Sequence, residues 1–119
     1  MTFKQAKRKT IQHWNRMIKW VNKLKNKKVK PHHYTMFDVI GEDWFADSCT
    51  LCFYAYEKFR TTENWPISKC DLCSLGKKYG TCSDPGTKNA WISVQKSKTW
   101  KGWLYHANRL IKQIESLEE

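Results

Sequence analysis

The first thirty residues repeat apolar positions with the period of an α-helix. At 100° per residue, one face of the stretch from Phe3 to about Lys28 is apolar and holds Phe3, Ala6, Trp14, Met17, Ile18, Val21 and Leu24, with Ile11 at its edge. The opposite face is basic and holds Arg8, Lys9, Arg16, Lys19, Lys23 and Lys27. We expect Pro31 to end the helix, because proline lacks a backbone N–H donor. The pattern predicts an amphipathic helix whose solvent face carries one sign of charge.

A second apolar stripe lies in the last third of the chain. From Thr87 onward, helical spacing brings together Trp100, Trp103, Leu104, Ala107, Leu110, Ile111, Ile114 and Leu117. Gly102 is a candidate position for a kink in this helix. Each of the two long helices has to bury its apolar stripe, and packing one helix against the other buries both.

Shorter elements are expected between these helices. Thr35-Met-Phe-Asp38 has the form of a capping box and predicts a short helix through about Ala46. The run Phe53–Phe59 fits either a helix or a strand, and its periodicity does not separate the two. Residues 47–86 otherwise combine cysteines, prolines and glycines, which is typical of loops.

These elements predict one mainly α domain, residues 1–119. Its two long amphipathic helices are the basic helix within residues 1–30 and the C-terminal helical segment within residues 87–119. We expect them to pack around a loop-rich, metal-binding centre, residues 47–86, in which a short hairpin is an optional addition.

The uneven distribution of charge along the chain indicates an anionic partner. The formal net charge is +11, and residues 1–37 contain eleven Lys or Arg and no Asp or Glu, so the remainder of the chain is balanced. A single-signed helix face forgoes i,i+4 pairs and is costly unless an anionic partner offsets the repulsion. Nucleic acid is the commonest such partner, although a merely solvated face is the alternative. We expect the six basic residues of the helix face to contact it, with Trp20, at the edge of that face, as a stacking group. The acidic residues Glu115, Glu118 and Glu119 could lie beside part of this helix.

All five cysteines fall within 34 consecutive positions. Two C-x2-C pairs, Cys49/Cys52 and Cys70/Cys73, are separated by 17 residues, and Cys82 follows. This spacing is typical of structural zinc sites, because two such turns can aim four thiolates at one ion. Either Cys73 or Cys82 supplies the fourth bond, and the fifth thiol is spare or exchanges with a ligand. An iron–sulfur cluster is the alternative metal centre.

Other function classes receive less support from the sequence. We see no transmembrane span and no signal-peptide core, so we expect a reducing cytoplasm and thiols that bind metal, with no membrane partner. His32 or His33 could replace a cysteine as a ligand. His106-Ala-Asn108 invites comparison with treble-clef nucleases, but it lies beyond the cysteines with no second matching histidine. A closed four-thiolate site has no position for substrate, so we expect no enzymatic activity.

The succession of a helix, the pair Cys49/Cys52, the pair Cys70/Cys73, the lone Cys82 and a long helix resembles small zinc-binding proteins encoded by bacteriophages. The resemblance implies a phage protein in the host cytoplasm that serves host takeover or defence evasion. Proteins of that class commonly bind a nucleic acid, a nucleotide signal or a host enzyme. We therefore expect a zinc-stabilised basic binding module with nucleic acid as its leading partner. The alternatives are an inhibitor that blocks a host defence protein and a protein that sequesters a nucleotide signal.

Overall fold

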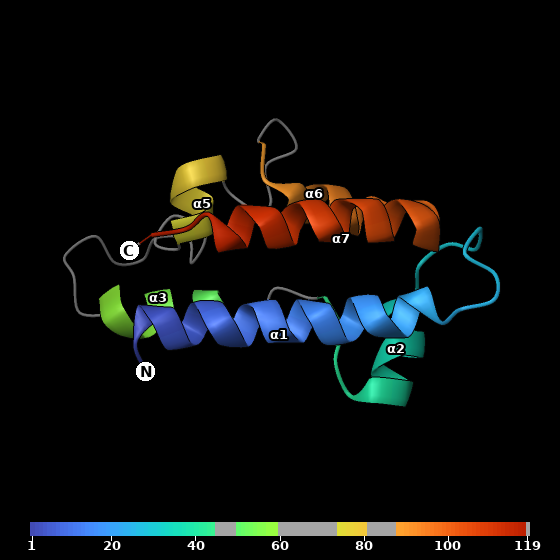
Figure 1. Ribbon diagram of the computed structural model, residues 1–119, viewed down its shortest axis with the longest axis horizontal. Helices are drawn as coiled ribbons and strands as arrows, with labels where there is room; N and C mark the ends of the chain where they lie inside the picture. Colours follow the sequence, from blue (N-terminus) through green and yellow to red (C-terminus); the bar gives the residue numbers. More distant parts are fainter. Residues whose placement is uncertain (45–49, 60–73, 81–87, 119) are drawn as a thin grey trace.

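The computed structural model describes residues 1–44, 50–59, 74–80 and 88–118 (Figure 1). The described helices are α1 (Phe3–Asn22), α2 (His33–Ile40), α3 (Thr50–Phe59), α5 (Ser74–Tyr79), α6 (Ala90–Gln95) and α7 (Trp100–Glu115). No strand occurs among these residues, so the mainly α prediction is confirmed and the run 53–59 is helical. Within the same ranges, no helix is both long enough and apolar enough to cross a bilayer.

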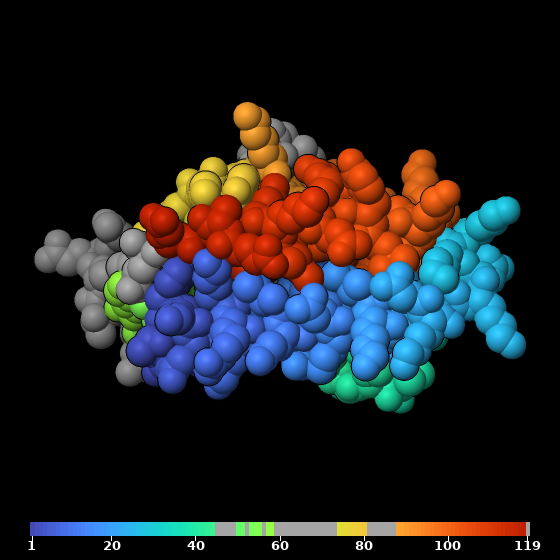
Figure 2. All heavy atoms as spheres, viewed as in Figure 1, coloured from blue at the N-terminus to red at the C-terminus, as the bar shows by residue number. Residues whose placement is uncertain are grey.

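The two long helices pack against each other, as the apolar stripes predict. They run antiparallel, and their atoms form two bands that lie side by side along the molecule (Figures 1 and 2). The buried residues of α1 include Ala6, Trp14, Met17, Ile18 and Val21. The buried residues of α7 are Trp100, Trp103, Ala107, Leu110, Ile111 and Ile114. Burial of these faces removes most of the apolar surface of both helices from water, which is the main favourable contribution to their packing.

A cluster of five tryptophans forms one end of the helix interface. Trp14 of α1 stacks on Trp103 of α7 at a centroid distance of 5.9 Å, and Trp103 is fully buried. Trp44, which follows α2, meets both Trp100 and Trp103 edge-to-face, at 5.7 and 5.5 Å. Trp20 meets Trp100 edge-to-face at 5.6 Å. Edge-to-face and offset arrangements are those that the ring quadrupoles favour. The cluster joins α1, α7 and the segment after α2 into one core.

The first helix is shorter than its apolar pattern predicts. It begins with a capping box that the sequence analysis overlooked: Thr2 Oγ1 accepts from the Gln5 N–H, and Gln5 Oε1 accepts from the Thr2 N–H. It ends at Asn22, with Lys23 as C-cap, so the predicted extension to Lys28 and the termination by Pro31 are wrong. The lysine-rich segment that follows turns away from the helix axis.

Contacts with α7 explain where this helix ends. The backbone carbonyl of Val29 accepts from the Trp100 N–H at 3.0 Å, and that of Lys27 accepts from the Lys101 N–H at 2.9 Å. Trp100 and Lys101 open α7, where N–H groups have no partner within the helix. The segment after α1 therefore caps α7, which it could not do as a continued helix. Repulsion between lysines spaced four apart also disfavours continuation.

The boundaries of the shorter helices also differ from the predictions. The N-cap of α2 is His32, and Thr35 lies inside the helix, so the proposed capping box at Thr35 is wrong. Gly41 ends α2 with φ of 71°, a left-handed conformation that glycine adopts without steric cost. The kink expected near Gly102 is instead a break between α6 and α7 just before it, where Thr99 Oγ1 accepts from the Gly102 N–H as N-cap.

The start of α1 and the end of α7 lie together. Lys7 Nζ donates to the backbone carbonyls of Glu115 and Leu117, at 2.7 and 3.0 Å. The C-terminal end of α7 is thus beside the basic helix as expected, but this lysine contacts backbone carbonyls and not the Glu115 carboxylate.

Two short helices pack at this same end of the helix pair. In α3, the ring of Tyr54 lies 5.9 Å from that of Phe3, at the start of α1. In α5, the hydroxyl of Tyr79 lies 2.7 Å from Ser116 Oγ, just after α7. Leu51 of α3 and Leu75 of α5 are both buried in the core. Both helices are therefore attached to the end where α1 begins and α7 finishes (Figure 1).

Replacing Lys7 by Met tests the contribution of its contact with α7. The ammonium group satisfies two carbonyls and complements the negative end of the helix dipole, so we expect Lys7→Met to lower the free energy of unfolding by about 1 kcal/mol. Thermal denaturation should show a drop of a few degrees in Tm. Lys4→Met is the matched control, because Lys4 is exposed on the same helix; equal effects from both variants would contradict the proposed role of Lys7.

Candidate functional site

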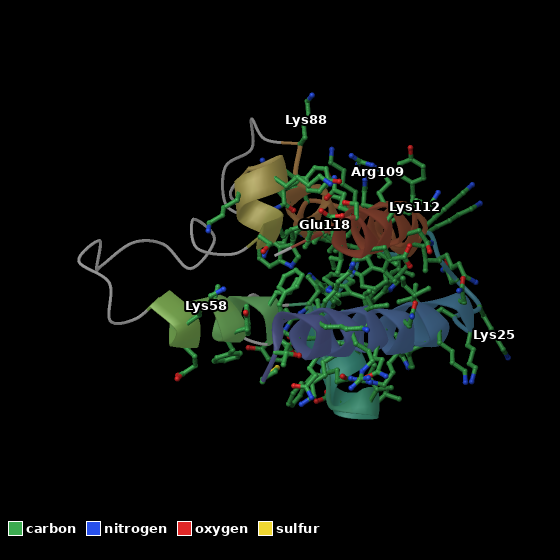
Figure 3. The ribbon with its side chains drawn as sticks, turned by 60° about the vertical axis from the view of Figure 1, so that its left-hand side comes forward. Lys25, Lys58, Lys88, Arg109, Lys112 and Glu118 are labelled. Atoms are coloured by element: carbon green, nitrogen blue, oxygen red, sulfur yellow. The ribbon has the colours of Figure 1, made fainter. Side chains whose placement is uncertain are left out.

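The basic residues predicted on the face of α1 point into solvent. Arg8, Lys9, Arg16, Lys19 and Lys23 are exposed, and Lys27 is half-buried beyond the helix end. The following segment adds three further exposed cations: Lys25, Lys28 and Lys30. Figure 3 shows Lys25 pointing away from the packed helices. The cationic surface therefore covers the outer side of α1 and the segment that follows it.

Two of the six residues are engaged inside the protein. Arg16 binds Glu42, and Lys27 Nζ donates to the Leu24 carbonyl at 2.7 Å. The other four make no ion pair with any carboxylate in the described ranges: Arg8, Lys9, Lys19 and Lys23. As far as the described residues go, the outer face of α1 therefore stays positively charged.

Glu42 joins the segment after α2 to α1. Its Oε2 accepts from Arg16 Nε at 2.6 Å, and its Oε1 accepts from Arg16 Nη2 and lies 2.9 Å from His13 Nδ1. The Arg16 hydrogen bond is the main cause that lowers the pKa of the Glu42 carboxyl, opposed by partial burial and supported by His13. The same bond raises the pKa of Arg16. Because an ionised carboxylate only accepts, the buried His13 holds its proton at Nδ1.

The contacts of Glu42 with His13 and Arg16, called the Glu42 clamp below, were not predicted from the sequence. His13 and Arg16 are separated from Glu42 by 29 and 26 residues, and helical periodicity carries no information about pairs so far apart. His13 was also missed as a buried residue, along with Thr10, whose hydroxyl donates to the Ala6 carbonyl at 2.9 Å. One sequence feature could have indicated a contact here: Glu42 and Asp43 directly follow Gly41, the glycine that ends α2.

Two other candidate residues, Trp20 and His33, make contacts of a different kind. Trp20 is half-buried against Trp100, so its ring belongs in part to the tryptophan cluster. His33 Nδ1 lies 3.7 Å from Asp43 Oδ2, and its ring meets Trp44 edge-to-face at 6.2 Å. In the described part of the chain, no three His, Cys, Asp or Glu side chains form a cluster that could hold a metal ion.

A shallow cavity of about 420 Å³ lies between α6 and α7, lined by Ile92, Ser93, Lys96, Ser97, Lys98, Gly102 and His106. His106 Nδ1 accepts from Arg109 Nη1 at 2.9 Å, and burial followed by the Arg109 charge lowers the pKa of this histidine. The amides that open α7 already bond to Val29, Lys27 and Thr99 oxygens. The cavity therefore lacks the free helix-terminal donors that commonly bind a phosphate group.

The predicted metal ligands fall outside what the structure describes. Cys49, Cys70, Cys73 and Cys82 lie outside the described residues, and so does the side chain of Cys52. The described residues nearest to them are those of α3, which contains Cys52, and of α5. The zinc assignment stays a prediction.

Comparison with protein-family models, with curated proteins and with solved structures finds no match to this chain.

The Glu42 clamp predicts a specific pH dependence of stability. Because the folded state lowers the pKa of Glu42, its stabilising effect is complete above the ordinary glutamate pKa of about 4.3 and is lost as pH falls through the lowered value. We expect Glu42→Gln to cost about 1–2 kcal/mol at pH 7. Denaturant unfolding should show this difference shrinking below about pH 4.3. Glu118→Gln, at an exposed position, is the control; a difference that is independent of pH would contradict the assignment.

Proposed function

We propose that this protein is a non-enzymatic binding module that engages a polyanion, nucleic acid in the first place, through the outer face of α1. The observation that carries the proposal is the set of four exposed cations along α1 and at its C-cap, Arg8, Lys9, Lys19 and Lys23, without carboxylate partners in the described ranges. Their mutual repulsion is relieved when phosphates neutralise them. Such contacts give affinity and orientation without reading sequence.

A polymer suits this surface better than a small nucleotide does. The cations lie along the helix and not around a hollow, so a chain of phosphates can meet several of them at once. The cavity between α6 and α7 has two lysines at its rim, but its helix-terminal amides are already bonded. A mononucleotide would therefore find only side-chain donors there.

A structural zinc ion is the second part of the proposal. The support is the spacing of the two C-x2-C pairs, of which Cys52 belongs to α3 and Cys73 comes before Ser74 of α5 in the sequence. Those two helices pack at one end of the α1–α7 pair, so a shared ion would tie them together. The ion would stabilise the fold and would leave the basic face free. The resemblance to bacteriophage proteins suggests that such a module serves host takeover or defence evasion.

Neutralising the four free cations tests the binding face. The variant Arg8→Gln, Lys9→Gln, Lys19→Gln, Lys23→Gln should lose most of its affinity for DNA or RNA while its Tm changes little, because these side chains are exposed. If all four meet phosphates, the slope of log K against log salt should become shallower by roughly 3–4. Fluorescence anisotropy with a labelled oligonucleotide at several salt concentrations measures both effects.

The matched control neutralises four exposed lysines elsewhere, Lys96, Lys98, Lys101 and Lys112, which lie in or near α6 and α7. The net charge then falls by the same amount, so only the position of the charge differs. Equal loss of affinity in both variants would contradict a specific role for α1. Failure of the unaltered protein to bind any polyanion would refute the proposed function.

Elemental analysis tests the metal centre. We expect about one zinc per chain, and we expect chelation to lower the free energy of unfolding by several kcal/mol, since metal binding is coupled to folding. Cys52→Ser should release the ion, whereas Cys82→Ser tests whether the lone cysteine is the spare thiol. An ion-free protein whose Tm is unchanged by chelator would show that the cysteines serve another purpose.

A further inference from the structure

The short helix α2 presents large apolar rings to solvent. Tyr34 is 61% exposed and Phe37 is 51% exposed, and they lie three residues apart on one face of the helix. Only Met36 of this helix is fully buried, and it anchors α2 in the core. Rings of this size usually contribute most when they are buried, so their joint exposure on one turn of helix indicates a binding surface.

The first turn of α2 holds its rings in a fixed arrangement. The imidazoles of His32 and His33 are stacked with an interplanar angle of 5° and a centroid distance of 5.4 Å. The ring of Tyr34 lies 4.0 Å from that of His33 and 5.3 Å from that of His32. His33 is in turn positioned by Asp43 and Trp44. The ring of Tyr34 is thus held by contacts with both imidazoles, which reduces the entropy cost of stacking a base on it.

This aromatic surface lies beside the cationic face. Glu42, two residues beyond the end of α2, bonds Arg16 and His13 and so fixes α2 against α1. Arg16 is one turn of helix from Lys19, which belongs to the free cations. In Figures 1 and 2, α2 projects from the side of α1 that faces away from α7. A ligand that follows the outer face of α1 therefore comes close to the rings of α2.

From this juxtaposition we infer that the nucleic acid is single-stranded: its phosphates meet the cations of α1 and its bases stack on Tyr34 and Phe37. This inference rests on the proposed function and specifies its substrate class. Every base has a π-face, so stacking on exposed rings holds unpaired bases without reading their sequence. In a duplex those faces are already covered by neighbouring bases. The cations can bind the phosphates of a single strand or of a duplex, whereas the rings can stack only on unpaired bases.

The charge around the rings favours a nucleic acid over an apolar protein surface as the occupant. Arg16 bonds Glu42 just beyond α2, Lys19 lies one helical turn from Arg16, and on α2 itself the sole carboxylate is Asp38. A partner here has to supply negative charge and flat apolar groups together, which a single strand does at every nucleotide.

The test compares two variants that remove exposed rings from different helices. Tyr34→Leu with Phe37→Leu keeps apolar side chains and helix propensity but removes both π-faces; Tyr105→Leu removes a ring that is 65% exposed on α7. Each protein is titrated into a labelled twelve-nucleotide oligothymidine and into a duplex of the same length, at the same salt concentration. We expect the double variant to bind the single strand at least tenfold more weakly. Its duplex affinity, its salt slope and the behaviour of Tyr105→Leu should match the unaltered protein.

Tyr34→Phe should retain full affinity, because it keeps the ring and removes only the hydroxyl. The inference is overturned if the double variant binds the oligothymidine as tightly as the unaltered protein does; duplex binding that still depends on the α1 cations would then leave the proposed function intact. It is equally overturned if the double variant keeps its nucleic-acid affinity but no longer co-purifies with a host protein, since the rings would then be a protein-docking surface. If the unaltered protein binds neither oligonucleotide, both the inference and the proposed function fail.

Discussion

Burial of the apolar face of α1 against α7 determines where every other feature lies. Trp14 stacks on the fully buried Trp103, and Met17 and Val21 are equally inaccessible to water. A rotation of α1 about its axis would expose these side chains and bring lysines into the core, at a cost of several kcal/mol for the apolar groups alone. The outward direction of the cations is therefore a consequence of hydrophobic packing and needs no contact of its own.

The helix ends add a second restraint, on the position of α7 along the axis of α1. The carbonyls of Lys27 and Val29 accept from the first N–H groups of α7, and Lys7 donates to its last carbonyls. Each contact joins one end of α7 to a residue in or just beyond α1. Together they fix the register of the pair, and they satisfy backbone groups that would otherwise depend on water.

Periodicity in the sequence was sufficient to predict both long helices and their buried faces, because the spacing of residues such as Trp14 and Trp103 reflects a property of each helix alone. Periodicity was insufficient to predict where α1 ends. Lys23 to Lys28 retain helical spacing in the sequence, but this segment leaves the helix axis and bonds to the start of α7. Five of the six predicted basic residues are exposed, whereas Lys27 lies beyond the helix and bonds the Leu24 carbonyl. The pairing of Arg16 with Glu42 was not predicted, because it depends on how α2 packs. The exposed rings of α2 were missed for the same reason: exposure is a property of the whole fold. The metal-site prediction rests on the spacing of the cysteines alone, and their side chains lie outside the part of the chain that the structure describes.

The straight twenty-residue body of α1 also sets a length scale. With a rise of 1.5 Å per residue, Arg8 and Lys23 are separated by roughly 22 Å along the axis. On one strand of B-form geometry, with a phosphate about every 3.4 Å, this corresponds to roughly six consecutive nucleotides. On the proposed single-stranded partner, a helix of that length would cover a short footprint, and several copies would fit side by side along a long strand.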